Sequence, residues 1–485
     1  MNAIEIQHIS KSYGSVVALD DVNLSIPSGS IFGLIGPDGA GKTTLFRILT
    51  TLLLPNKGTA TVAGFDTVAD MLEIRKCVGY MPGKFSLYQD LSVEENLTFF
   101  ATLFNTTVAE GYEGIKDIYS QIEKFKTRRA GALSGGMKQK LALSCALIHN
   151  PKILFLDEPT TGVDPVSRTE FWEMLAKLKQ RGITIIASTP YLDEVRRCDE
   201  IGFIDKGKIM GVGQPDAILE QFKAIFMPEA PQKKAAENNK NEVVISVENL
   251  VKAFGTFHAV DGISFEVKRG EIFGFLGANG AGKTTAMRML NGLSQPTSGK
   301  ATVAGFDVST EYEEIKKHIG YMSQRFSLYE DMTVMENIRL FGGIYGMSHK
   351  QIAEKANYML ESMDFVGEAN TIVGSLPLGR KQKLAFSVSI FHEPDVVFLD
   401  EPTGGVDPAT RKQFWNLIYE AAGRGITVFV TTHYMDEAEY CDRISIMVDG
   451  KIKALGSPAE LKQQYAATDM GEVFRLLARG AKRGD

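Results

Sequence analysis

Two glycine-rich segments have the spacing that lets a backbone wrap around phosphate. GPDGAGKTT begins at Gly36, GANGAGKTT begins at Gly277, and both satisfy the pattern G-x-x-x-x-G-K-[ST]. Each follows a short apolar run and precedes a helical pattern, the context expected of a phosphate-binding P-loop. Backbone amides can then point at phosphate oxygens, and the following helix adds its positive end. The residues expected to bind the nucleotide are Gly36, Gly39, Gly41, Lys42, Thr43 and Thr44, and Gly277, Asn279, Gly280, Gly282, Lys283, Thr284 and Thr285.

The lysine and the threonine after it have separate expected roles in each segment. Lys42 and Lys283 would reach the β- and γ-phosphates of ATP. Thr43 and Thr284 would hold Mg²⁺ through their hydroxyl oxygens. The sequence therefore predicts ATP and Mg²⁺ as cofactors.

A pair of neighbouring carboxylates also occurs twice, in the repeated segment FLDEPT. Asp157 and Asp400 end apolar runs, where a carboxylate can position Mg²⁺. Glu158 and Glu401 follow directly and could orient or deprotonate the water that attacks ATP. Two solvated acids at a strand end are the alternative, but that does not explain why the same pair recurs after each P-loop.

These motifs repeat because the chain contains two homologous halves. The P-loops start 241 residues apart, as do the ATVAGFD segments at Ala60 and Ala301, and the FLDEPT segments start 243 residues apart. A period this long indicates two domains, each with its own core. Residues 227–242, MPEAPQKKAAENNKNE, are polar and typical of a flexible linker. We therefore expect domains at 1–226 and 243–485.

Buried strands are expected to position the motifs. SIFGLIG, KILFLDE, TIIAST and VFVTTH are apolar on both faces, which favours parallel strands covered by helices. Because such runs alternate with amphipathic stretches, we predict an α/β sheet with helices on both faces. Residues of about 86–140 and 327–383 are mainly helical in pattern, and we expect them to be helical insertions in the α/β core.

Composition narrows the functional classes. The 485 residues carry a net charge of −6, which argues against a broad nucleic-acid-binding surface. No apolar run approaches the roughly 18 residues that a membrane-spanning helix needs, and the N-terminus lacks a signal-peptide pattern. We therefore expect a cytosolic protein for which another chain supplies any membrane spans. The four cysteines form no CxxC pair, and the seven histidines form no metal-ligand pattern.

The segment LSGGMKQK, residues 133–140, identifies the family that the chain resembles. Ser134 could cap a helix there, and Gly135 and Gly136 would expose amides to an anion. Together with the P-loops and FLDEPT, this segment resembles the signature of ATP-binding cassette (ABC) ATPases, and the resemblance covers nearly the whole chain in two copies. It implies two tandem P-loop nucleotide-binding domains, each with a RecA-like core, a small antiparallel β part and a helical subdomain.

The resemblance assigns roles to further residues. The aromatic residue that stacks on adenine matches Tyr13 and Phe254, and the loop between two ATP sites matches Asp164 and Asp407. The remaining matches lie in the second half only. Gln324, in YMSQRF, matches the glutamine that touches Mg²⁺ and water, and His433, in TTHYMDE, matches the histidine that contacts the γ-phosphate. With Lys283 and Glu401 they complete the catalytic set that the resemblance implies.

Each half departs from the family pattern at different positions. The first half has Gly83 in place of the glutamine and Pro190 in place of the histidine. Neither side chain can donate to or accept from phosphate, metal or water. The second half reads LPLGRKQK, so Pro377 and Leu378 replace the serine and first glycine of the signature.

In the family, two cassettes associate head to tail, and each ATP lies between the P-loop of one and the signature of the other. Under this pairing all three defects fall in the site of the first P-loop, whereas the second P-loop faces the intact signature at Ser134. We therefore expect one catalytic site and one site that binds ATP but hydrolyses it slowly.

Transport is the function that the resemblance implies. Residues 85–100 and 326–341 match the groove that receives a coupling helix from a membrane subunit, and the ending DMGEVFRLLARG is similar to that of ABC-2 and multidrug-type exporter ATPases. We expect the C-terminal helix, about 468–479, to dock on its own cassette through Val473, Phe474 and Leu477. The expected partners are two integral-membrane permease chains, without nucleic acid. The resemblance also allows an accessory periplasmic protein and places the chain in the cytoplasm, peripheral on the inner face of the cell membrane.

Three other functions stay open at this point. A soluble tandem ABC ATPase that acts on the ribosome or nucleic acid also lacks membrane spans, although such proteins usually carry a long charged linker. A tandem ATPase of a sugar importer also keeps one working site. A nucleotide-gated regulator would bind ATP without turnover, which the complete set around Glu401 argues against.

Overall fold

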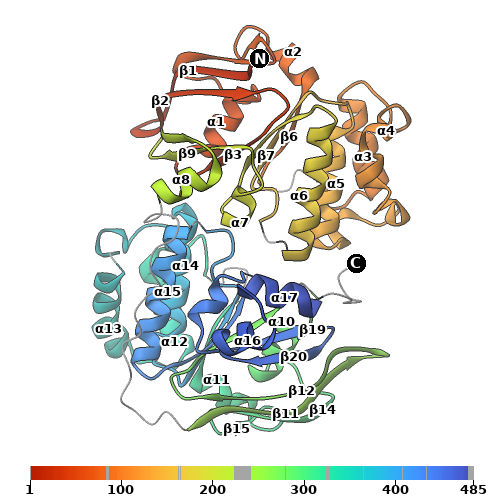
Figure 1. The fold of residues 1–485 in the computed structure, drawn as a ribbon. Coiled ribbons are helices and arrows are strands. Elements are labelled where there is room, and N and C mark those ends of the chain that lie inside the picture. Colours follow the sequence, from red (N-terminus) through yellow and green to blue (C-terminus); the bar gives the residue numbers. More distant parts are fainter. Residues whose placement is uncertain are drawn as a thin grey trace. The chain divides into compact units, whose positions relative to one another are not determined.

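The computed structural model describes residues 2–83, 87–161, 163, 165–222, 242–278, 280–323, 328–363, 365–406, 408–432 and 434–478. The chain forms two compact units that divide near residue 228 (Figure 1). Of the predicted linker, only Glu242 lies within the described residues, where it forms an ion pair with Arg269.

A six-stranded sheet forms the core of the first unit, in the order β10-β9-β3-β8-β7-β6. Its strands are β3 (Ile31–Ile35), β6 (Val78–Met81), β7 (Ile153–Asp157), β8 (Thr184–Ser188), β9 (Glu200–Asp205) and β10 (Lys208–Gly213). All neighbouring pairs are parallel except β9 and β10. Since β3 lies between β8 and β9, the first P-loop leaves the middle of the sheet beside the carboxyl ends of β7 and β8.

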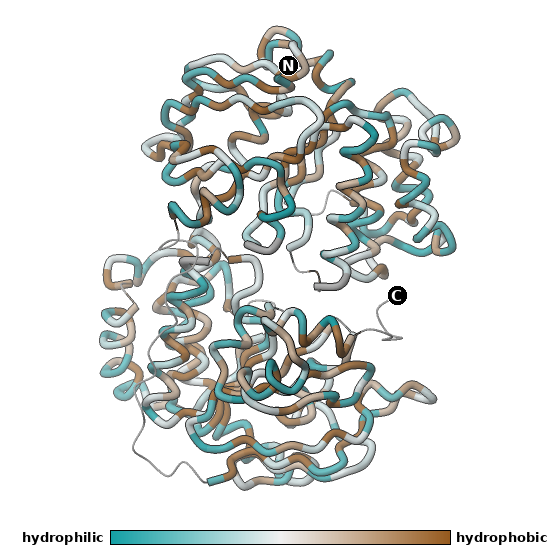
Figure 2. The backbone as a smooth tube through the Cα atoms, in the orientation of Figure 1, coloured by the Kyte–Doolittle hydropathy of each residue, from teal (hydrophilic) through white to brown (hydrophobic). Residues whose placement is uncertain are grey.

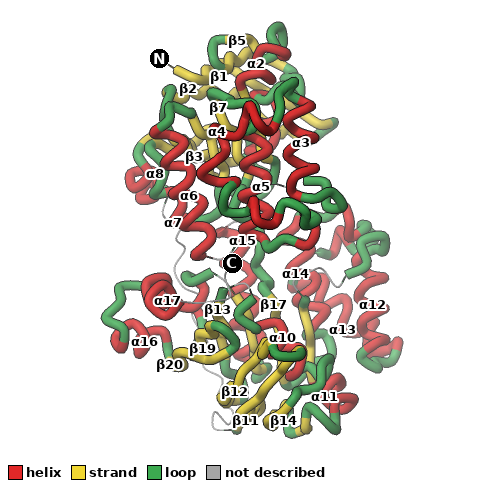
Figure 3. The backbone as a smooth tube through the Cα atoms, turned by 90° about the vertical axis from the view of Figure 1, so that its right-hand side faces the viewer, coloured by secondary structure: helices red, strands yellow, loops and turns green. Residues whose placement is uncertain are grey.

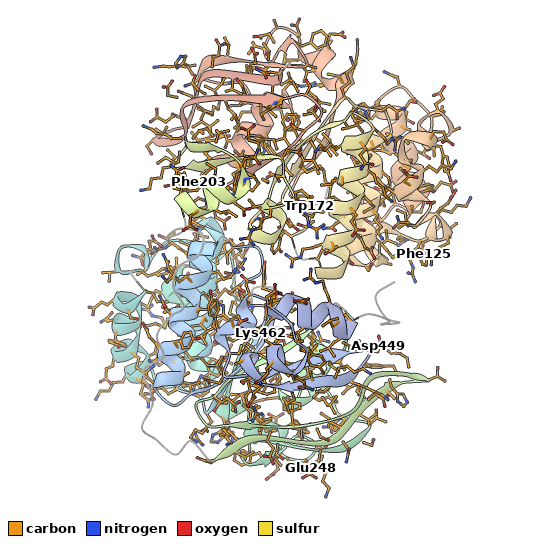
Figure 4. The ribbon with its side chains drawn as sticks, viewed as in Figure 1. Phe125, Trp172, Phe203, Glu248, Asp449 and Lys462 are labelled. Carbon is orange, nitrogen blue, oxygen red and sulfur yellow. The ribbon has the colours of Figure 1, made fainter. Side chains whose placement is uncertain are left out.

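Apolar side chains cover both faces of this sheet. Every residue of β3, β7 and β8 is buried, as predicted for strands between two helical layers. Hydrophobic segments, brown in Figure 2, follow these central strands. Trp172 and Phe203 belong to this core (Figure 4), with exposed fractions of 2% and 1%. The strands that carry the motifs are therefore fixed by burial on both sides.

A smaller antiparallel sheet, in the order β2-β1-β4-β5, completes the β part of the first unit. Its strands are β1 (Asn2–Tyr13), β2 (Val16–Pro27), β4 (Lys57–Val62) and β5 (Phe65–Asp66). β1 and β2 form a hairpin whose turn contains Gly14 in the left-handed region, at φ 58°. The hairpin therefore leaves Tyr13 at the end of β1, next to the turn.

The helices of the first unit are α1 (Lys42–Leu49), α2 (Met71–Cys77), α3 (Val93–Leu103), α4 (Val108–Tyr119), η1 (Glu123–Phe125), η2 (Ala130–Ala132), α5 (Gly135–Leu147), α6 (Pro165–Gln180), α7 (Leu192–Val195) and α8 (Pro215–Gln221). α3 and α4 begin with capping boxes formed by Ser92 with Glu95 and by Thr107 with Glu110. Both helices pack on α5, on the side of the unit away from β1 and β2 (Figure 1).

The second unit repeats this architecture. Its six-stranded sheet has the order β16-β17-β18-β13-β19-β20, and its antiparallel sheet has the order β12-β11-β14-β15. The strands are β11 (Val243–Phe254), β12 (Phe257–Lys268), β13 (Ile272–Gly277), β14 (Ser298–Val303), β15 (Phe306–Asp307), β16 (Ile319–Met322), β17 (Val396–Asp400), β18 (Thr427–Thr432), β19 (Arg443–Val448) and β20 (Lys451–Gly456). An aromatic cluster joins its two sheets, since Phe265 of β12 packs against Phe273 and Phe275 of β13.

The helices of the second unit are α10 (Lys283–Leu290), α11 (Tyr312–His318), α12 (Val334–Ile344), α13 (His349–Ser362), η3 (Val366–Glu368), η4 (Val373–Ser375), α14 (Leu378–Ser389), α15 (Pro408–Gly423), η5 (Glu437–Tyr440), α16 (Pro458–Gln464) and α17 (Met470–Ala478). α12 and α13 lie beside one another (Figure 3). The predicted fold class, two tandem nucleotide-binding domains with an α/β core, an antiparallel part and a helical subdomain, is confirmed.

The C-terminal helix α17 docks on its own unit. Val473 and Phe474 are fully buried in the hydrophobic core, and Leu477 packs against the same core. This confirms the docking expected for these side chains.

Other expectations concern membrane spans and thiols. Within the described ranges, no helix combines the length and the apolar character that crossing a bilayer requires. All four cysteines are free thiols; three are buried, and Cys77 is half-buried.

Candidate functional site

Each P-loop connects a central strand to a helix, as its sequence predicts. In the first unit β3 leads through Gly36 to α1, and in the second β13 leads through Gly277 to α10. Thr44 and Thr285 lie in the first turns of these helices. Asn279 lies outside the described residues.

The P-loop lysines are buried inside the loops. Lys42 Nζ donates to the carbonyl oxygens of Gly36 and Pro37, at 2.8 and 3.0 Å. Lys283 Nζ donates to those of Gly277 and Ala278, at 2.6 and 3.1 Å. Both ammonium groups are therefore held at the mouth of a loop whose amides can bind phosphate.

The last glycine of each P-loop is required by sterics. Gly41 and Gly282 have φ of 109° and precede α1 and α10 directly. A Cβ atom would lie 2.5 Å from the carbonyl oxygen of Ala18 at Gly41, and 2.3 Å from that of Ala259 at Gly282. Only glycine lets the loop turn this close to the antiparallel sheet.

A threonine hydroxyl and an aspartate meet at each predicted Mg²⁺ position. Thr43 Oγ1 donates to Asp157 Oδ2 at 2.7 Å, and Thr284 Oγ1 donates to Asp400 Oδ2 at 3.4 Å. The two aspartates are buried, with exposed fractions of 3% and 4%. Hydroxyl and carboxylate oxygens are the hard ligands that Mg²⁺ prefers, with nucleotide phosphates supplying others. The residues present therefore fit this ion.

The glutamates that follow these aspartates have constrained backbones. Glu158 and Glu401 have φ of 48° and 49°, in the left-handed region, which is strained for a residue with a side chain. The backbone amide of Glu158 donates to Ser188 Oγ at 2.9 Å, and that of Glu401 donates to Thr431 Oγ1 at 3.0 Å. The neighbouring strand therefore holds the backbone of both glutamates.

Ser188 and Thr431 are functional residues that sequence reasoning missed. Their hydroxyls also donate to the aspartates, Ser188 to Asp157 Oδ1 at 2.7 Å and Thr431 to Asp400 Oδ1 at 2.6 Å. Both positions lie opposite the aspartate in the parallel register. A polar residue at the end of an otherwise apolar run, as in TIIAST, is the available sequence signal.

Burial and charge shift the acidity of the carboxylates. Burial raises the pKa of Glu158 to about 7; nearby Lys42 lowers it, and Asp38 adds to the rise. In the second unit burial raises the pKa of Asp400, and its hydrogen bond from Thr431 opposes the shift. Lys283 Nζ lies 4.0 Å from Glu401 Oε1, so the P-loop cation and the proposed base face one another.

Gly83 and Pro190, which replace the family's glutamine and histidine in the first unit, lie just after the carboxyl ends of strands. Gly83 follows β6, and a Cβ atom there would be 3.2 Å from the carbonyl oxygen of Asp157. Pro190 comes two residues after β8 and is half-buried. Gln324 and His433, the matching residues of the second unit, lie outside the described residues, as do Asp164 and Asp407.

The predicted adenine-stacking aromatics lie exposed at strand ends. Tyr13 ends β1 and Phe254 ends β11, with exposed fractions of 47% and 59%. Lys11 and Lys252 lie over these rings, with Nζ 5.8 and 5.4 Å from the centroids. An open aromatic face of this kind suits stacking on a base.

The two signature segments differ at the helix start. Ser134 caps α5, and its Oγ accepts from the amide of Met137 at 3.4 Å; Gly135 and Gly136 form the first turn. Pro377 occupies the cap of α14 with no side-chain bond. The first unit thus has a capped helix start with small residues, whereas the second presents proline and leucine.

Two buried glutamines, also missed by sequence reasoning, connect these helices to the FLDEPT loops. The side-chain amide of Gln139 donates to the carbonyl oxygen of Pro159, and that of Gln382 to the carbonyl oxygen of Gly404 at 3.2 Å. Within each unit, hydrogen bonds therefore link the signature helix to the loop after the carboxylate pair.

Comparison with known proteins identifies the family in which these motifs occur. The family model described as ABC transporter matches residues 19–161 and 260–404, more than half of the chain. The "Probable multidrug ABC transporter ATP-binding protein YbhF" of Escherichia coli (strain K12) is 39% identical, with 96% of this chain and 94% of that protein covered. A "Putative ribose/galactose/methyl galactoside import ATP-binding protein" of Halalkalibacterium halodurans is 27% identical, with 95% of this chain and 92% of that protein covered.

A solved structure resembles the chain in fold. It is the archaeal ribosome recycling factor aABCE1 in complex with the ribosomal stalk protein aP1, with a TM-score of 0.66 and 20% identity over 95% of this chain and 92% of that one. At this identity the likeness concerns the fold alone. The matched family model and the 39% identical relative show that this chain belongs to the ABC transporter family, as a tandem ATPase with two ATP-binding cassettes.

Proposed function

We propose that this protein is the ATP-hydrolysing subunit of an exporter of the multidrug or ABC-2 type, which powers separate permease chains. Its second P-loop forms the catalytic site, and its first P-loop forms a site that retains ATP. The observation that carries the proposal is the geometry around Glu401: its backbone amide donates to Thr431 Oγ1, and its carboxylate lies 4.0 Å from Lys283 Nζ.

The residues around the second P-loop divide the work of hydrolysis. Lys283 and the loop amides bind the phosphates, and Thr284 with Asp400 would hold Mg²⁺, which supplies positive charge to the phosphate oxygens when bound. Glu401 orients the attacking water and accepts its proton. From the sequence, Gln324 and His433 are proposed to contact that water and the γ-phosphate.

The proposed difference between the two ATP sites follows from the positions at which family residues are replaced. If the cassettes pair head to tail, the second P-loop faces the capped helix start at Ser134. The first P-loop then faces Pro377 and is flanked by Gly83 and Pro190. Losing a positioned charge-stabilising or proton-transfer group lowers a rate about 10²–10⁴-fold. We therefore assign nearly all turnover to the site with Glu401, and ATP retention to the site with Lys42 and Thr43.

Export is favoured by the multidrug relative, which is more similar to this chain than the import relative is, with 39% against 27% identity. The exporter-like ending in α17 agrees with that choice. Import of a sugar and action on a ribosome are the competing functions. The fold likeness to a recycling factor does not favour the ribosome, because a tandem cassette fold serves several functions.

Exposed aromatic and aliphatic side chains mark where permease subunits would bind. Tyr88, Phe99 and Leu103 are 50%, 40% and 60% exposed, and the Tyr88 and Phe99 rings lie 4.8 Å apart. Tyr329 and Ile344 occupy the corresponding region of the second unit, 51% and 63% exposed. We propose that each of these two patches receives a helix from one of two permeases, at the inner face of the cell membrane.

Trapping with a substrate-bound variant tests this function. Tagged full-length chain carrying Glu401→Gln should hold ATP and co-purify with integral-membrane proteins from gently solubilised cells. Inside-out vesicles containing those proteins and the wild-type chain should accumulate an exported compound with ATP, and vesicles with Glu401→Gln should not. Co-purification of ribosomes in place of membrane proteins, or ATP-driven movement in the opposite direction, would contradict the proposal.

A further inference from the structure

A fully buried carboxylate connects two loops of the second unit, the unit that carries the proposed catalytic P-loop. Glu437, at the start of η5, has an exposed fraction of 0%. Its Oε1 accepts from the Thr403 hydroxyl at 2.5 Å, and its Oε2 accepts from the Thr432 hydroxyl at 2.7 Å. Thr403 lies two residues after Glu401, and Thr432 is the last residue of β18. We call Glu437, Thr403 and Thr432 the carboxylate bridge.

Tyr434 and Arg411 reinforce the same connection. The backbone amide of Tyr434 donates to Thr432 Oγ1 at 3.0 Å, and the amide of Gly405 donates to the Tyr434 hydroxyl at 3.2 Å. The Arg411 guanidinium lies 4.0 Å from the centroid of the Tyr434 ring, and its Nε is 3.6 Å from Glu437 Oε1. The loop after β17, the loop after β18 and the start of α15 are therefore joined by side chains.

The first unit repeats this arrangement around Glu194, which is 1% exposed. Glu194 Oε2 accepts from the hydroxyls of Thr160, at 2.9 Å, and Thr189, at 2.5 Å. Arg168 lies over the ring of Tyr191, 4.0 Å from its centroid. The structure thus offers a matched bridge in the unit whose P-loop is flanked by Gly83 and Pro190.

A carboxylate in this environment requires its partners. A buried acid is strongly destabilising unless hydrogen bonds and an opposite charge compensate it, and here both oxygens are bonded and Arg411 lies close. Satisfied buried networks of this kind hold a single geometry. An apolar residue of similar size would pack the same space but would not connect the two loops.

We propose that Glu437 is a positioning residue for ATP hydrolysis, which through Thr403 and Thr432 keeps the loop after Glu401 in register with the loop after β18. The inference rests on the proposed function, in which the site with Glu401 carries the turnover. Glu401 itself has a strained backbone, and its carbonyl oxygen accepts from the amide of Gly404, the residue after Thr403, at 3.2 Å. A displacement of about 1 Å in a reacting group can lower a rate on the order of 10²-fold.

Glu437→Gln in the purified full chain tests the proposal. The amide keeps the volume but breaks the pattern of two accepting oxygens. We expect kcat to fall about 10- to 100-fold while KM for ATP changes less than about twofold, because the P-loop contacts are untouched. The matched Glu194→Gln should keep kcat within about threefold of wild type.

A milder pair of variants separates positioning from loss of folding. Thr403→Val removes one hydroxyl of the bridge and should lower kcat without changing KM, whereas Thr403→Ser should restore it. In the double variant with Glu437→Gln, the loss from Thr403→Val should largely disappear, because both changes break the same bond.

The outcomes distinguish this inference from the proposed function. Wild-type kcat in Glu437→Gln, with Glu401→Gln inactive, would overturn the bridge and leave the proposed function standing. Equal falls in kcat for Glu437→Gln and Glu194→Gln would support the bridge and contradict the assignment of turnover to one site. If Glu437→Gln does not fold, equal kcat for Thr403→Val and Thr403→Ser overturns the bridge.

Discussion

The two P-loops make similar contacts with their own strands and differ in the groups placed around them. Thr43 bonds Asp157 at 2.7 Å and Thr284 bonds Asp400 at 3.4 Å, and both lysines are buried against loop carbonyls. The first loop, however, carries Asp38, whose negative charge adds to that of the nearby carboxylates.

This comparison teaches that binding and turnover use separable parts of a cassette. The groups that hold phosphate come from one strand and one helix, so they persist as a unit. The groups proposed to act on water come from other loops, where Gly83 and Pro190 occupy the first unit. Both residues lie beyond a strand end, outside the hydrogen-bonded part of the sheet.

The largest expected difference between the units concerns the two glutamates. Glu401→Gln should lower steady-state ATPase at least about 10²-fold, because the amide cannot accept a proton from water. Glu158→Gln should leave most of the activity, because Glu158 acts in the proposed slow site. Phosphate release by the purified chain measures both, and equal losses would contradict the asymmetric assignment.

An exchange of signature residues sharpens the comparison with a smaller expected effect. Ser134→Pro with Gly135→Leu gives α5 the helix start that α14 already has, so the fold should tolerate it. We expect ATPase to fall about 10- to 100-fold, because the proposed catalytic site loses donors to phosphate. The reciprocal Pro377→Ser with Leu378→Gly should not lower activity. If the first exchange is silent and the reciprocal raises turnover tenfold, the head-to-tail assignment is wrong.

The smallest effect is a pH dependence of stability that originates in the first unit. Burial raises the pKa of Glu158 from 4.5 to about 7, so between these pH values the folded state holds a proton that the unfolded state has released. Stability then falls as pH rises through this window. Glu158→Gln lacks this proton, so its melting temperature should fall less between pH 5 and pH 8 than that of wild type. The two falls should differ by about 2–6 °C.

Melting curves without nucleotide and with chelator measure this difference, and Asp38→Asn is the matched control. Since Asp38 raises the pKa of Glu158, its removal should shift the dependence in the same direction as Glu158→Gln but by less. Parallel pH profiles for wild type and Glu158→Gln would contradict the assignment.

Much of the fold follows from local patterns in the sequence. KILFLDE and TIIAST form the buried parallel strands that their apolar character predicts, and the P-loop consensus forms the turn between β3 and α1. The burial of Val473 and Phe474 in α17 likewise follows from an amphipathic ending. These features depend on residues close together in the chain.

The supporting parts of the site depend on distant residues and could not be predicted. Ser188 reaches Asp157 only because two strands 31 residues apart pair in one register. Glu437, the last residue of the segment TTHYMDE, joins Thr403 to Thr432, a contact that the local sequence pattern does not indicate. In a single sequence, such contacts resemble ordinary polar positions near strand ends. The roles of Gln324 and His433 stay predictions.

The packing of the last P-loop glycine against the antiparallel sheet limits which substitutions either cassette can accept. A backbone carbonyl occupies the space of a Cβ atom at both Gly41 and Gly282, so even alanine would push the hairpin that carries Tyr13 or Phe254 away from the loop. Mutation at these glycines would damage base and phosphate recognition together. Selection that retains the nucleotide therefore tolerates change at positions such as Gly83 and Pro190 long before it tolerates change here.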